Sequence, residues 1–374
     1  MIKVLNVISD MNIGGAGRVL ENYLSSRNKA EFEVSAAIPR GSLLKAKLGP
    51  FGVKIYEVDA MRDRSFDLRA VPRLIRVIRE ENPDIVHTHG AFSGRIAGKR
   101  CGKKVLMTRH SAFPLPQWIK IWPIRTVYRI LSERFTDRII AVSPVCRDCI
   151  SDIGVDPGMT EVLMNGVVAM ERSAPEKLSE FRRRFGLREG LFTAGIIARL
   201  EPYKGHLYVL EAARDLKQTG RDFRIIAAGT GACMEELRSK AAELGLTDLV
   251  LFPGFIEDVQ TLYSALDLQI NASYVEASSL ALLEGMSLGL PSIVSDCGGN
   301  PDIIKDGISG FVFPVHDSRK LAERMAMLMD DAELRRKMGA EARIDYETNY
   351  TGKVFARKLE DIYRKTMGGN INGQ

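Results

Sequence analysis

Cysteine and tryptophan are scarce in this sequence. Its 374 residues include five cysteines and two tryptophans. The cysteines are irregularly spaced. Cys146 and Cys149 lie three residues apart, but neither a second cysteine pair nor a nearby histidine completes a set of metal ligands. This pattern argues against a disulfide framework or a cysteine-bound metal, and it predicts the reduced, structural thiols of a cytosolic protein.

Long hydrophobic runs are also missing. No stretch approaches the roughly 20 consecutive apolar residues that a membrane-spanning helix needs. The opening residues, MIKVLNVIS, read as a short strand interrupted by Lys3 and Asn6 rather than as a signal peptide. We therefore expect a cytoplasmic location.

The length and composition indicate a soluble protein with two domains. A chain of 374 residues exceeds the size at which one hydrophobic core usually keeps growing. Hydrophobic residues make up 45% and charged residues 27%, as in ordinary globular proteins. We expect a first domain over residues 1–170, a second over 171–352, and a C-terminal helix with a tail over 353–374.

Positive charge is concentrated in the first half. Residues 1–170 hold 26 Lys/Arg and 17 Asp/Glu, whereas the remainder holds 27 and 30, within a net charge of +6. This asymmetry favours an anionic surface or acceptor near the first half. The sequence contains no pattern of basic and aromatic residues typical of RNA binding, so we expect no nucleic-acid partner.

Residues 273–303 carry the most informative pattern. They predict a strand end, a helix of roughly ten residues starting near Ser278 or Ser279, a strand at PSIVS, and a Gly-rich turn. The serines suit the helix start, whose free amides can bind an anion. Glu276 precedes the helix and Glu284 lies inside the apolar run LALLEGMSLGL, where an unpaired charge would be costly. The vicinal hydroxyls of a ribose would fit Glu284.

In the first half, predicted strands and helices alternate, which favours a parallel sheet covered on both faces. After the first strand, Gly14, Gly15 and Gly17 open a helix and allow a ligand to approach the backbone. A dinucleotide site is disfavoured, because the spacing is GGAG and no acidic residue follows the next strand. A simple tight turn is the structural alternative.

Histidines lie at two predicted strand ends, where ligands gather in parallel sheets. His87 and His89 are two residues apart, and we expect their rings to point to opposite faces of the strand, with one ring packed or capping the strand end. A metal site there is disfavoured because no third ligand is nearby. His110 follows the strand KVLMTR and is the candidate for a site role, with an ordinary loop histidine as the alternative.

In the second half, two cations flank a predicted strand-to-helix turn. Arg199 projects from the tip of the strand that ends at Ala198, and Lys204-Gly205 begins the next helix. Two positive charges beside a helix N-terminus suit a leaving diphosphate. A solvated basic turn is the alternative.

An aromatic and basic segment lies between these regions. Trp118 and Trp122 are interspersed with isoleucines and with Lys120, Arg125 and Arg129. That mixture suits the surface of an anionic membrane and a lipid-linked acceptor, with peripheral attachment to the inner face of the plasma membrane. A segment that covers the hydrophobic core is the alternative.

Taken together, these motifs resemble the retaining GT-B glycosyltransferases of family 4. The resemblance rests on Glu276 and Glu284 with the following small-residue helix, Gly-Leu-Pro, strand and Gly-Gly-Asn-Pro-Asp, and on Arg199-Leu200 before Lys204-Gly205. It covers about residues 1–365 and implies an α/β fold of the GT-B type, with two Rossmann-like domains and a donor cleft between them. It also implies that residues 1–170 form the acceptor domain, that residues 171–352 form the nucleotide-sugar domain, and that the helix over 353–374 crosses back to the first domain.

The resemblance also implies roles for individual residues. His110 would reach the donor sugar, and Glu276 would hold sugar hydroxyls. Arg199 and Lys204 would hold the diphosphate. The residues implied in binding the donor are Gly15, Gly229, Phe255, Ala277, Ser278, Ser279, Leu280 and Glu284.

The sequence departs from the family pattern at three places. Ala277-Ser278-Ser279 replaces the usual glycine and aromatic residue, which leaves the identity of the sugar open. Val168 stands where the family usually has an acidic residue. Gly285 replaces the usual alanine, which we expect to be a minor packing change.

The expected activity is transfer of a sugar, with retention, from a nucleoside-diphosphate sugar to an acceptor hydroxyl. A UDP-sugar is favoured as donor, and a lipid-linked or polysaccharide precursor as acceptor. No Asp-x-Asp motif is present, so we expect neither a metal nor a cofactor. Two alternatives stay open: a nucleotide-sugar epimerase or hydrolase on the same fold, and a catalytically degenerate partner subunit.

Overall fold

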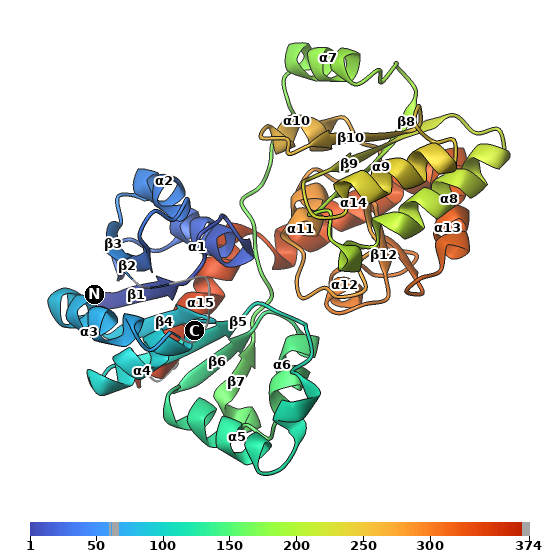
Figure 1. The fold of residues 1–374 in the computed structure, drawn as a ribbon. Helices are drawn as coiled ribbons and strands as arrows, with labels where there is room; N and C mark the ends of the chain where they lie inside the picture. Colours follow the sequence, from blue (N-terminus) through green and yellow to red (C-terminus); the bar gives the residue numbers. More distant parts are fainter. Residues whose placement is uncertain (60, 62–66, 369–374) are drawn as a thin grey trace. The chain divides into compact units, whose positions relative to one another are not determined.

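The computed structural model describes residues 1–59, 61 and 67–368. The chain forms two compact units (Figure 1). Unit 1 comprises Met1–Val168 with Thr351–Gln374, and unit 2 comprises Ala169–Tyr350. Of the expected C-terminal helix and tail over 353–374, residues 369–374 lie outside the described residues.

Unit 1 is built on a parallel sheet of seven strands in the order β3-β2-β1-β4-β5-β6-β7. The strands are β1 (Ile2–Ile8), β2 (Phe32–Pro39), β3 (Lys54–Val58), β4 (Ile85–His89), β5 (Lys104–Arg109), β6 (Arg138–Ala141) and β7 (Thr160–Val162). The central strands read as nearly continuous apolar runs because helices cover both of their faces.

The helices of unit 1 come from both ends of the chain. They are α1 (Gly15–Ser26), α2 (Leu44–Leu48), η1 (Gly49–Phe51), α3 (Ala70–Glu81), α4 (Phe92–Arg100), η2 (Gln117–Lys120), α5 (Ile124–Arg134), α6 (Pro144–Ser151), η3 (Pro157–Met159) and α15 (Gly352–Thr366). Helix α15 packs against α1. The Gly352 amide also donates to the Val167 carbonyl at 2.8 Å, so the last helix completes the first unit.

Unit 2 contains a second parallel sheet, of six strands in the order β10-β9-β8-β11-β12-β13. The strands are β8 (Phe192–Ile197), β9 (Phe223–Ala228), β10 (Val250–Gly254), β11 (Leu268–Asn271), β12 (Ser292–Ser295) and β13 (Gly310–Phe313). The helices are α7 (Pro175–Arg184), η4 (Pro202–Lys204), α8 (His206–Gln218), α9 (Met234–Glu243), α10 (Val259–Ser264), α11 (Leu280–Ser287), α12 (Asn300–Ile303), α13 (Ser318–Asp330) and α14 (Ala332–Asn349).

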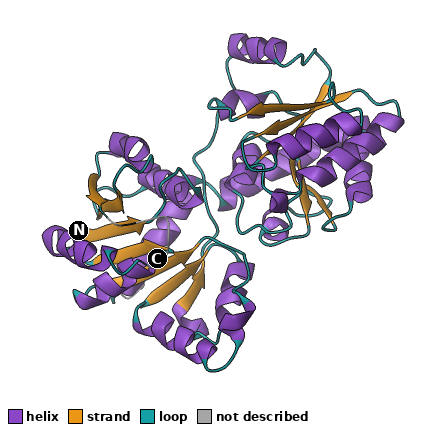
Figure 2. Cartoon of the chain, in the orientation of Figure 1, coloured by secondary structure: helices purple, strands orange, loops and turns teal. Residues whose placement is uncertain are grey.

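The two faces of the unit 2 sheet bury separate hydrophobic clusters. Ile225 and Ala227 of β9 pack with α8, α9 and α13, whereas Ile226 and Ala228 pack with α10 on the opposite face. Successive side chains of a strand point to opposite faces, so one strand contributes to both clusters. Helices therefore flank the strands in each unit (Figure 2), and the predicted α/β class with two parallel sheets is confirmed.

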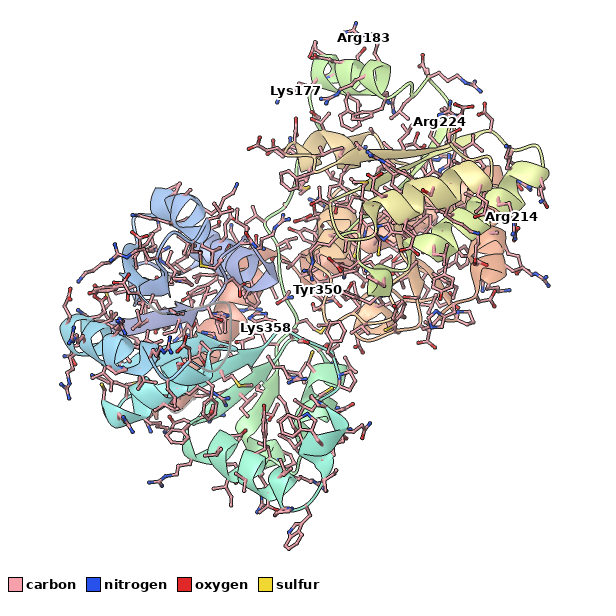
Figure 3. All side chains as sticks on the ribbon, in the orientation of Figure 1. Lys177, Arg183, Arg214, Arg224, Tyr350 and Lys358 are labelled. Atoms are coloured by element: carbon pink, nitrogen blue, oxygen red, sulfur yellow. The ribbon has the colours of Figure 1, made fainter. Side chains whose placement is uncertain are left out.

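Helix α7 lies at the margin of unit 2. It has no fully buried residue, and Lys177 and Arg183 project from it (Figure 3). Its Leu178 and Phe181 cover part of the hydrophobic cluster around α10. No helix among the described residues is long and apolar enough to cross a membrane.

The replacement of the family's usual alanine by Gly285 is not the minor packing change that we expected from the sequence. A Cβ atom built on this glycine of α11 would lie 1.8 Å from Gln269 Oε1. Gln269 lies on β11 and is 2% exposed, so its amide has little freedom to move away. The glycine therefore makes room for a buried glutamine, and the two positions are coupled.

We predict that Gly285→Ala destabilises unit 2 by about 1–3 kcal/mol, the usual cost of overpacking a core. Gln269→Ala in the same chain should restore much of that loss by removing the clashing amide. Urea unfolding of the wild type, both single variants and the double variant gives the coupling energy. Additive effects of the two substitutions would contradict this coupling.

Candidate functional site

Unit 2 places its two predicted cations around the carboxyl end of β8. Arg199 follows the strand by two residues, and Lys204 ends η4 directly before α8. Gly205 caps α8 with φ of 71°, and a Cβ there would lie 2.0 Å from the Ala272 carbonyl oxygen. Glycine is therefore required in the Lys-Gly pair, because the turn is left-handed and pressed against the end of β11.

Lys204 and Glu276 form an ion pair. Lys204 Nζ lies 2.7 Å from Glu276 Oε2, with the two side chains only 16% and 11% exposed. The same oxygen accepts hydrogen bonds from Ser273 Oγ at 3.2 Å and Asn271 Nδ2 at 3.4 Å. A largely buried carboxylate is thus balanced by a cation and two polar donors.

Arg199 is held by a tyrosine that also borders Lys204. The Arg199 guanidinium donates to Tyr203 Oη. Lys204 Nζ lies 5.5 Å from the centre of the Tyr203 ring, and Arg199 Cζ lies 6.0 Å from it. One aromatic side chain therefore gathers both cations, with the negative face of its ring available to stabilise them.

Helix α11 begins where the sequence predicted. Ser279 is its N-cap, and Ser279 Oγ accepts a hydrogen bond from the Leu282 amide at 3.3 Å. The helix is eight residues long rather than about ten, and Leu280 is its first residue. Ala277 and Ser278 are buried just before it. The short apolar helix thus opens on polar groups that lie next to Glu276.

Glu284 is buried in α11, at 4% exposure. Its Oε2 lies 3.2 Å from Tyr263 Oη, which also lies 2.8 Å from the Ala281 carbonyl oxygen. The sequence predicted that this buried carboxylate needs a polar partner. The structure supplies one within the chain, Tyr263 of α10.

Two more glycines of unit 2 allow close backbone approach. Gly229, at the end of β9, has φ of 147°, and a Cβ there would lie 1.9 Å from the Ala198 carbonyl oxygen. Gly298 has φ of 57°, and its Cβ would lie 1.7 Å from the Glu276 carbonyl oxygen. The Gly-Gly turn after β12 is thus fitted against the backbone of Glu276. Phe255, beyond β10, is 75% exposed.

In unit 1, the glycine loop opens α1 as predicted. Gly15 is the first residue of the helix, and no atom lies within 4 Å of where its Cβ would be. By contrast, a Cβ on Gly14 would lie 2.7 Å from Asp10 Oδ2, and one on Gly17 would lie 2.1 Å from Leu44 Cδ2. Packing against the buried Leu44 therefore explains why residue 17 is glycine, whereas the space beside Gly15 is open.

The expectation that His87 and His89 point to opposite faces of β4 is wrong. Their ring centres are 4.5 Å apart and the rings are stacked. Residues i and i+2 of a strand share a face, and it is the intervening residue that points the other way. That residue, Thr88, faces α4, where a Cβ on Gly94 would come within 2.9 Å of its methyl group.

His110 joins this pair at the end of β5. Its Nε2 lies 2.9 Å from His89 Nδ1, while His89 Nε2 lies 3.0 Å from Asn6 Oδ1. Burial lowers the pKa of His110 to about 4, and burial with the nearby His110 lowers the pKa of His87 to about 3. These imidazoles are therefore neutral at neutral pH. Across the described part of the chain, no group of three or more His, Cys, Asp or Glu is placed to hold a metal ion.

Two family models cover most of the chain. The model described as Glycosyltransferase Family 4 matches residues 13–169, and the one described as Glycosyl transferases group 1 matches residues 179–345. EpsD of Bacillus subtilis (strain 168) is 32% identical over 317 residues, which cover 80% of this chain and 81% of EpsD. The chain belongs to the group 1, family 4 glycosyltransferases.

Other relatives and solved structures agree with this assignment. The UDP-Gal:alpha-D-GlcNAc-diphosphoundecaprenol alpha-1,3-galactosyltransferase of Escherichia coli is 29% identical over 280 residues, covering 72% of each chain. The structure of Anabaena HepE in complex with UDP has a TM-score of 0.84 at 20% identity and covers 97% of this chain and 100% of HepE. The fold of this glycosyltransferase is therefore GT-B.

Several residues in this glycosyltransferase's site were missed by the sequence analysis. Tyr203, Tyr263, Asn271 and Ser273 contact the predicted cations and carboxylates from strand ends and helices. Asn271 and Ser273 could have been found, since Asn271 ends β11 and Ser273 follows it at the carboxyl edge of the sheet. Tyr263 could not, because nothing local marks its contact with a residue 21 positions away.

A second feature of unit 1 is an exposed apolar surface on α5 and the segment before it, here called the α5 surface. Ile124, Val127 and Leu131 are spaced three and four residues apart, on one face of the helix, and all are exposed. Tyr128 packs instead against the cluster that includes Ile119. The other exposed apolar residues of this surface are Trp118, Ile121, Trp122 and Ile130. The alternative that this segment only covers the core does not account for so much exposed apolar area.

We predict that unit 1 loses stability as the pH falls below about 6.5. The unfolded chain binds protons at His87 and His110 near pH 6.5, whereas the folded chain does so only near pH 3–4. Between these values the unfolded state holds more protons, so stability rises with pH. By pH 5 the loss should be about 2 kcal/mol per histidine.

This pH dependence can be followed in urea unfolding through the fluorescence of Trp118 and Trp122, both of which lie in unit 1. His110→Asn removes one of the titrating groups and should show a smaller change between pH 7 and pH 5. The same midpoint shift in the wild type and the variant would contradict the assignment.

Proposed function

We propose that this glycosyltransferase transfers a sugar from a UDP-sugar to an acceptor hydroxyl, with retention at the anomeric carbon and without a metal ion or cofactor. Unit 2 is the nucleotide-sugar domain and unit 1 the acceptor domain. The acceptor is a lipid-linked or polysaccharide precursor. The nucleotide-sugar and the acceptor are its substrates, and no nucleic acid is involved.

The observation that carries this proposal is the pairing of Lys204 with Glu276, at 2.7 Å. It brings a cation suited to a leaving diphosphate next to a carboxylate suited to sugar hydroxyls. Such an arrangement matches the junction between the phosphate and the sugar of a nucleotide-sugar. The N-terminus of α8 lies directly after Lys204 and adds amide donors for the same anion.

In the proposed reaction, the bond between the anomeric carbon and the diphosphate oxygen breaks as the acceptor oxygen bonds to that carbon on the same face. The acceptor hydroxyl gives its proton to the leaving phosphate oxygen. Arg199 and Lys204 stabilise the charge that develops on the diphosphate. Glu276 orients the sugar through its hydroxyls. Because the acceptor oxygen attacks on the same face that the diphosphate leaves, this route uses no carboxylate nucleophile.

The remaining site residues are assigned to donor binding. Glu284 holds the ribose, with Tyr263 as its partner in the free chain. His110 and the open backbone at Gly15 contact the donor sugar and diphosphate. The other residues that we assign to contacts with the nucleotide and sugar are Gly229, Phe255, Ala277, Ser278, Ser279 and Leu280.

The relatives support UDP as the nucleotide and a lipid-borne acceptor. The Escherichia coli relative is named for UDP-Gal and a diphosphoundecaprenol acceptor, and HepE was crystallised with UDP-glucose. A relative from Streptococcus pneumoniae, 27% identical over 273 residues, is an alpha-monoglucosyldiacylglycerol synthase. These acceptors belong to membranes, which fits an enzyme that works at a lipid surface.

We further propose that the α5 surface attaches the enzyme peripherally to the cytoplasmic face of an anionic membrane. Trp122 is 79% exposed and Val127 53% exposed, and the arginines of α5 add positive charge. Apolar side chains bordered by cations match the interface of an anionic bilayer.

We predict that Lys204→Ala lowers the transfer rate by about 10²–10³-fold, the cost of removing one preorganised stabiliser of charge in the transition state. Transfer from UDP-sugars to a lipid-linked acceptor, together with calorimetry of UDP binding, measures this effect. Lys320→Ala is the matched control, since Lys320 also forms an ion pair in unit 2 but lies on α13. Unchanged turnover in Lys204→Ala would contradict the proposal that Lys204 stabilises the leaving diphosphate.

Product analysis separates the alternatives in the same assay. Release of free sugar or an altered nucleotide-sugar without acceptor would identify a hydrolase or an epimerase. A chain that binds none of UDP, GDP and ADP would be a degenerate partner subunit rather than a transferase.

We predict that Val127→Asp reduces binding to vesicles containing anionic lipid by roughly tenfold, because a charge replaces buried apolar area at the interface. Co-sedimentation with phosphatidylglycerol vesicles measures the bound fraction. Ile344→Asp is the control, since Ile344 is similarly exposed at 54% but lies in unit 2. Equal losses in both variants, or binding that does not depend on anionic lipid, would contradict the assignment.

A further inference from the structure

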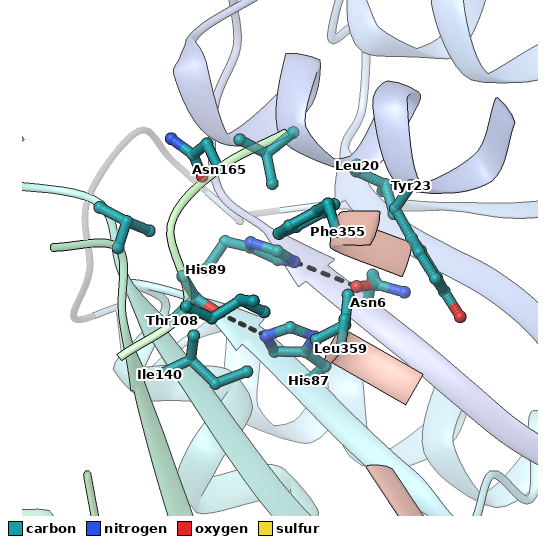
Figure 4. Close-up of a pocket in the computed structure, with 13 residues that line it drawn as sticks. Asn6, Leu20, Tyr23, His87, His89, Thr108, Ile140, Asn165, Phe355 and Leu359 are labelled. Atoms are coloured by element: carbon teal, nitrogen blue, oxygen red, sulfur yellow. Dashed lines mark hydrogen bonds between the residues drawn. The ribbon is translucent and has the colours of Figure 1, made fainter. Parts of the chain in front are cut away.

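Three polar side chains, two on strands and one directly after a third strand, form a chain of hydrogen bonds inside unit 1. Asn6 on β1 is 1% exposed, and His89 at the end of β4 is 7% exposed. Asn6 Oδ1 lies 3.0 Å from His89 Nε2, and His89 Nδ1 lies 2.9 Å from His110 Nε2. The rings of His89 and His110 are nearly parallel, at 18°, with their centres 5.1 Å apart. Figure 4 shows the Asn6–His89 end of this chain.

Asn6 Oδ1 faces His89, while Asn6 Nδ2 has no hydrogen-bond partner among the described residues. With the amide oxygen facing His89, the chemistry of the groups determines the proton positions. The amide oxygen of Asn6 can only accept, so His89 carries its proton on Nε2. Burial and the neighbouring histidines hold the pKa of His89 well below its usual range, so the ring is neutral and Nδ1 is an acceptor. His110 must then donate from Nε2, which leaves His110 Nδ1 without a proton.

His87 shows why Asn6 is the controlling group. The two ring nitrogens of His87 lie 2.8 Å from Tyr363 Oη and 2.7 Å from Thr108 Oγ1. Both partners are hydroxyls that can donate or accept, so they impose no single tautomer. An amide has chemically distinct ends, and a rotated Asn6 would donate to His89 and reverse every bond in the chain.

The space around Asn6 indicates that its role is internal. Asn6 lines a cavity of about 10 Å³, which Tyr23 also borders. That is roughly the space of one water molecule, too small for a sugar or a nucleotide. Asn6 therefore acts on ligands only through the histidines.

We propose that Asn6 is a positioning residue that, through His89, keeps the proton of His110 on Nε2 and presents Nδ1 as a hydrogen-bond acceptor. The consequence for catalysis rests on the proposed function, in which His110 contacts the donor sugar. There, Nδ1 accepts a hydrogen bond from a sugar hydroxyl, so the site favours donors that carry that hydroxyl over analogues that lack it.

The direct test is the tautomer of His110 in the intact protein. Long-range proton–nitrogen NMR of a ¹⁵N-histidine-labelled sample at pH 7.5 distinguishes protonated from unprotonated ring nitrogens. We expect His89 and His110 both to carry the proton on Nε2. A wild-type His110 protonated on Nδ1 would overturn the proposal, whatever the activity of the enzyme.

The variant Asn6→Leu removes the acceptor and should shift His89 and His110 to a mixture of tautomers. Tyr23→Phe is the matched control. Tyr23 borders the same cavity, but its hydroxyl makes no hydrogen bond to Asn6, His89 or His110 among the described residues. This variant should therefore leave both tautomers unchanged. Should Asn6→Leu not fold, Asn6→Val removes the same amide with a residue that strands favour. Unchanged tautomers in the folded variant would also overturn the proposal.

Kinetics separates this inference from the proposed function. The loss of one well-placed hydrogen bond should lower kcat by about five- to tenfold in the Asn6 variant. Tyr23→Phe should retain the wild-type kcat. A shifted tautomer with unchanged kcat would keep the positioning role of Asn6 and remove the proposed contact of His110 with the sugar.

Discussion

The ion pair between Lys204 and Glu276 is the interaction on which the site of unit 2 depends. Two opposite charges with little exposure are stable together and costly apart. In the free chain each charge satisfies the other, yet the proposed reaction assigns them to different parts of the donor. Donor binding must therefore replace this contact with equivalent ones, to phosphate for the lysine and to hydroxyls for the carboxylate, and that exchange favours ligands that offer both groups.

Parallel sheet topology explains why the site groups meet. In each unit the strands end at one edge, and the loops that leave this edge carry Arg199, Lys204 and Glu276 in unit 2 and His110 in unit 1. Helix N-termini lie at the same edge and contribute free amides. The arrangement thus follows from the fold, while the side chains on the loops determine the chemistry.

Much of the architecture was predictable because its signals are local. The alternation of strands and helices, the N-cap at Ser279 and the turn at Gly205 each depend on a few neighbouring residues. One error was local, because residues i and i+2 of a strand share a face and His87 and His89 therefore lie together. The other concerns a contact through space, since the constraint on Gly285 of helix α11 comes from Gln269 on β11. The partner of Lys204 lies 72 positions away, a distance that spacing arguments do not cover.

The close fit of Gly298 against the carbonyl of Glu276 has a consequence for protein engineering. The turn after β12 packs directly against the backbone of this acidic residue, although the two lie far apart in the sequence. A side chain introduced at position 298 would therefore push on the backbone of Glu276 without changing any residue next to it in the sequence. The placement of the acidic group thus depends on two separate loops, and a designer who alters one of them has to keep the other compatible.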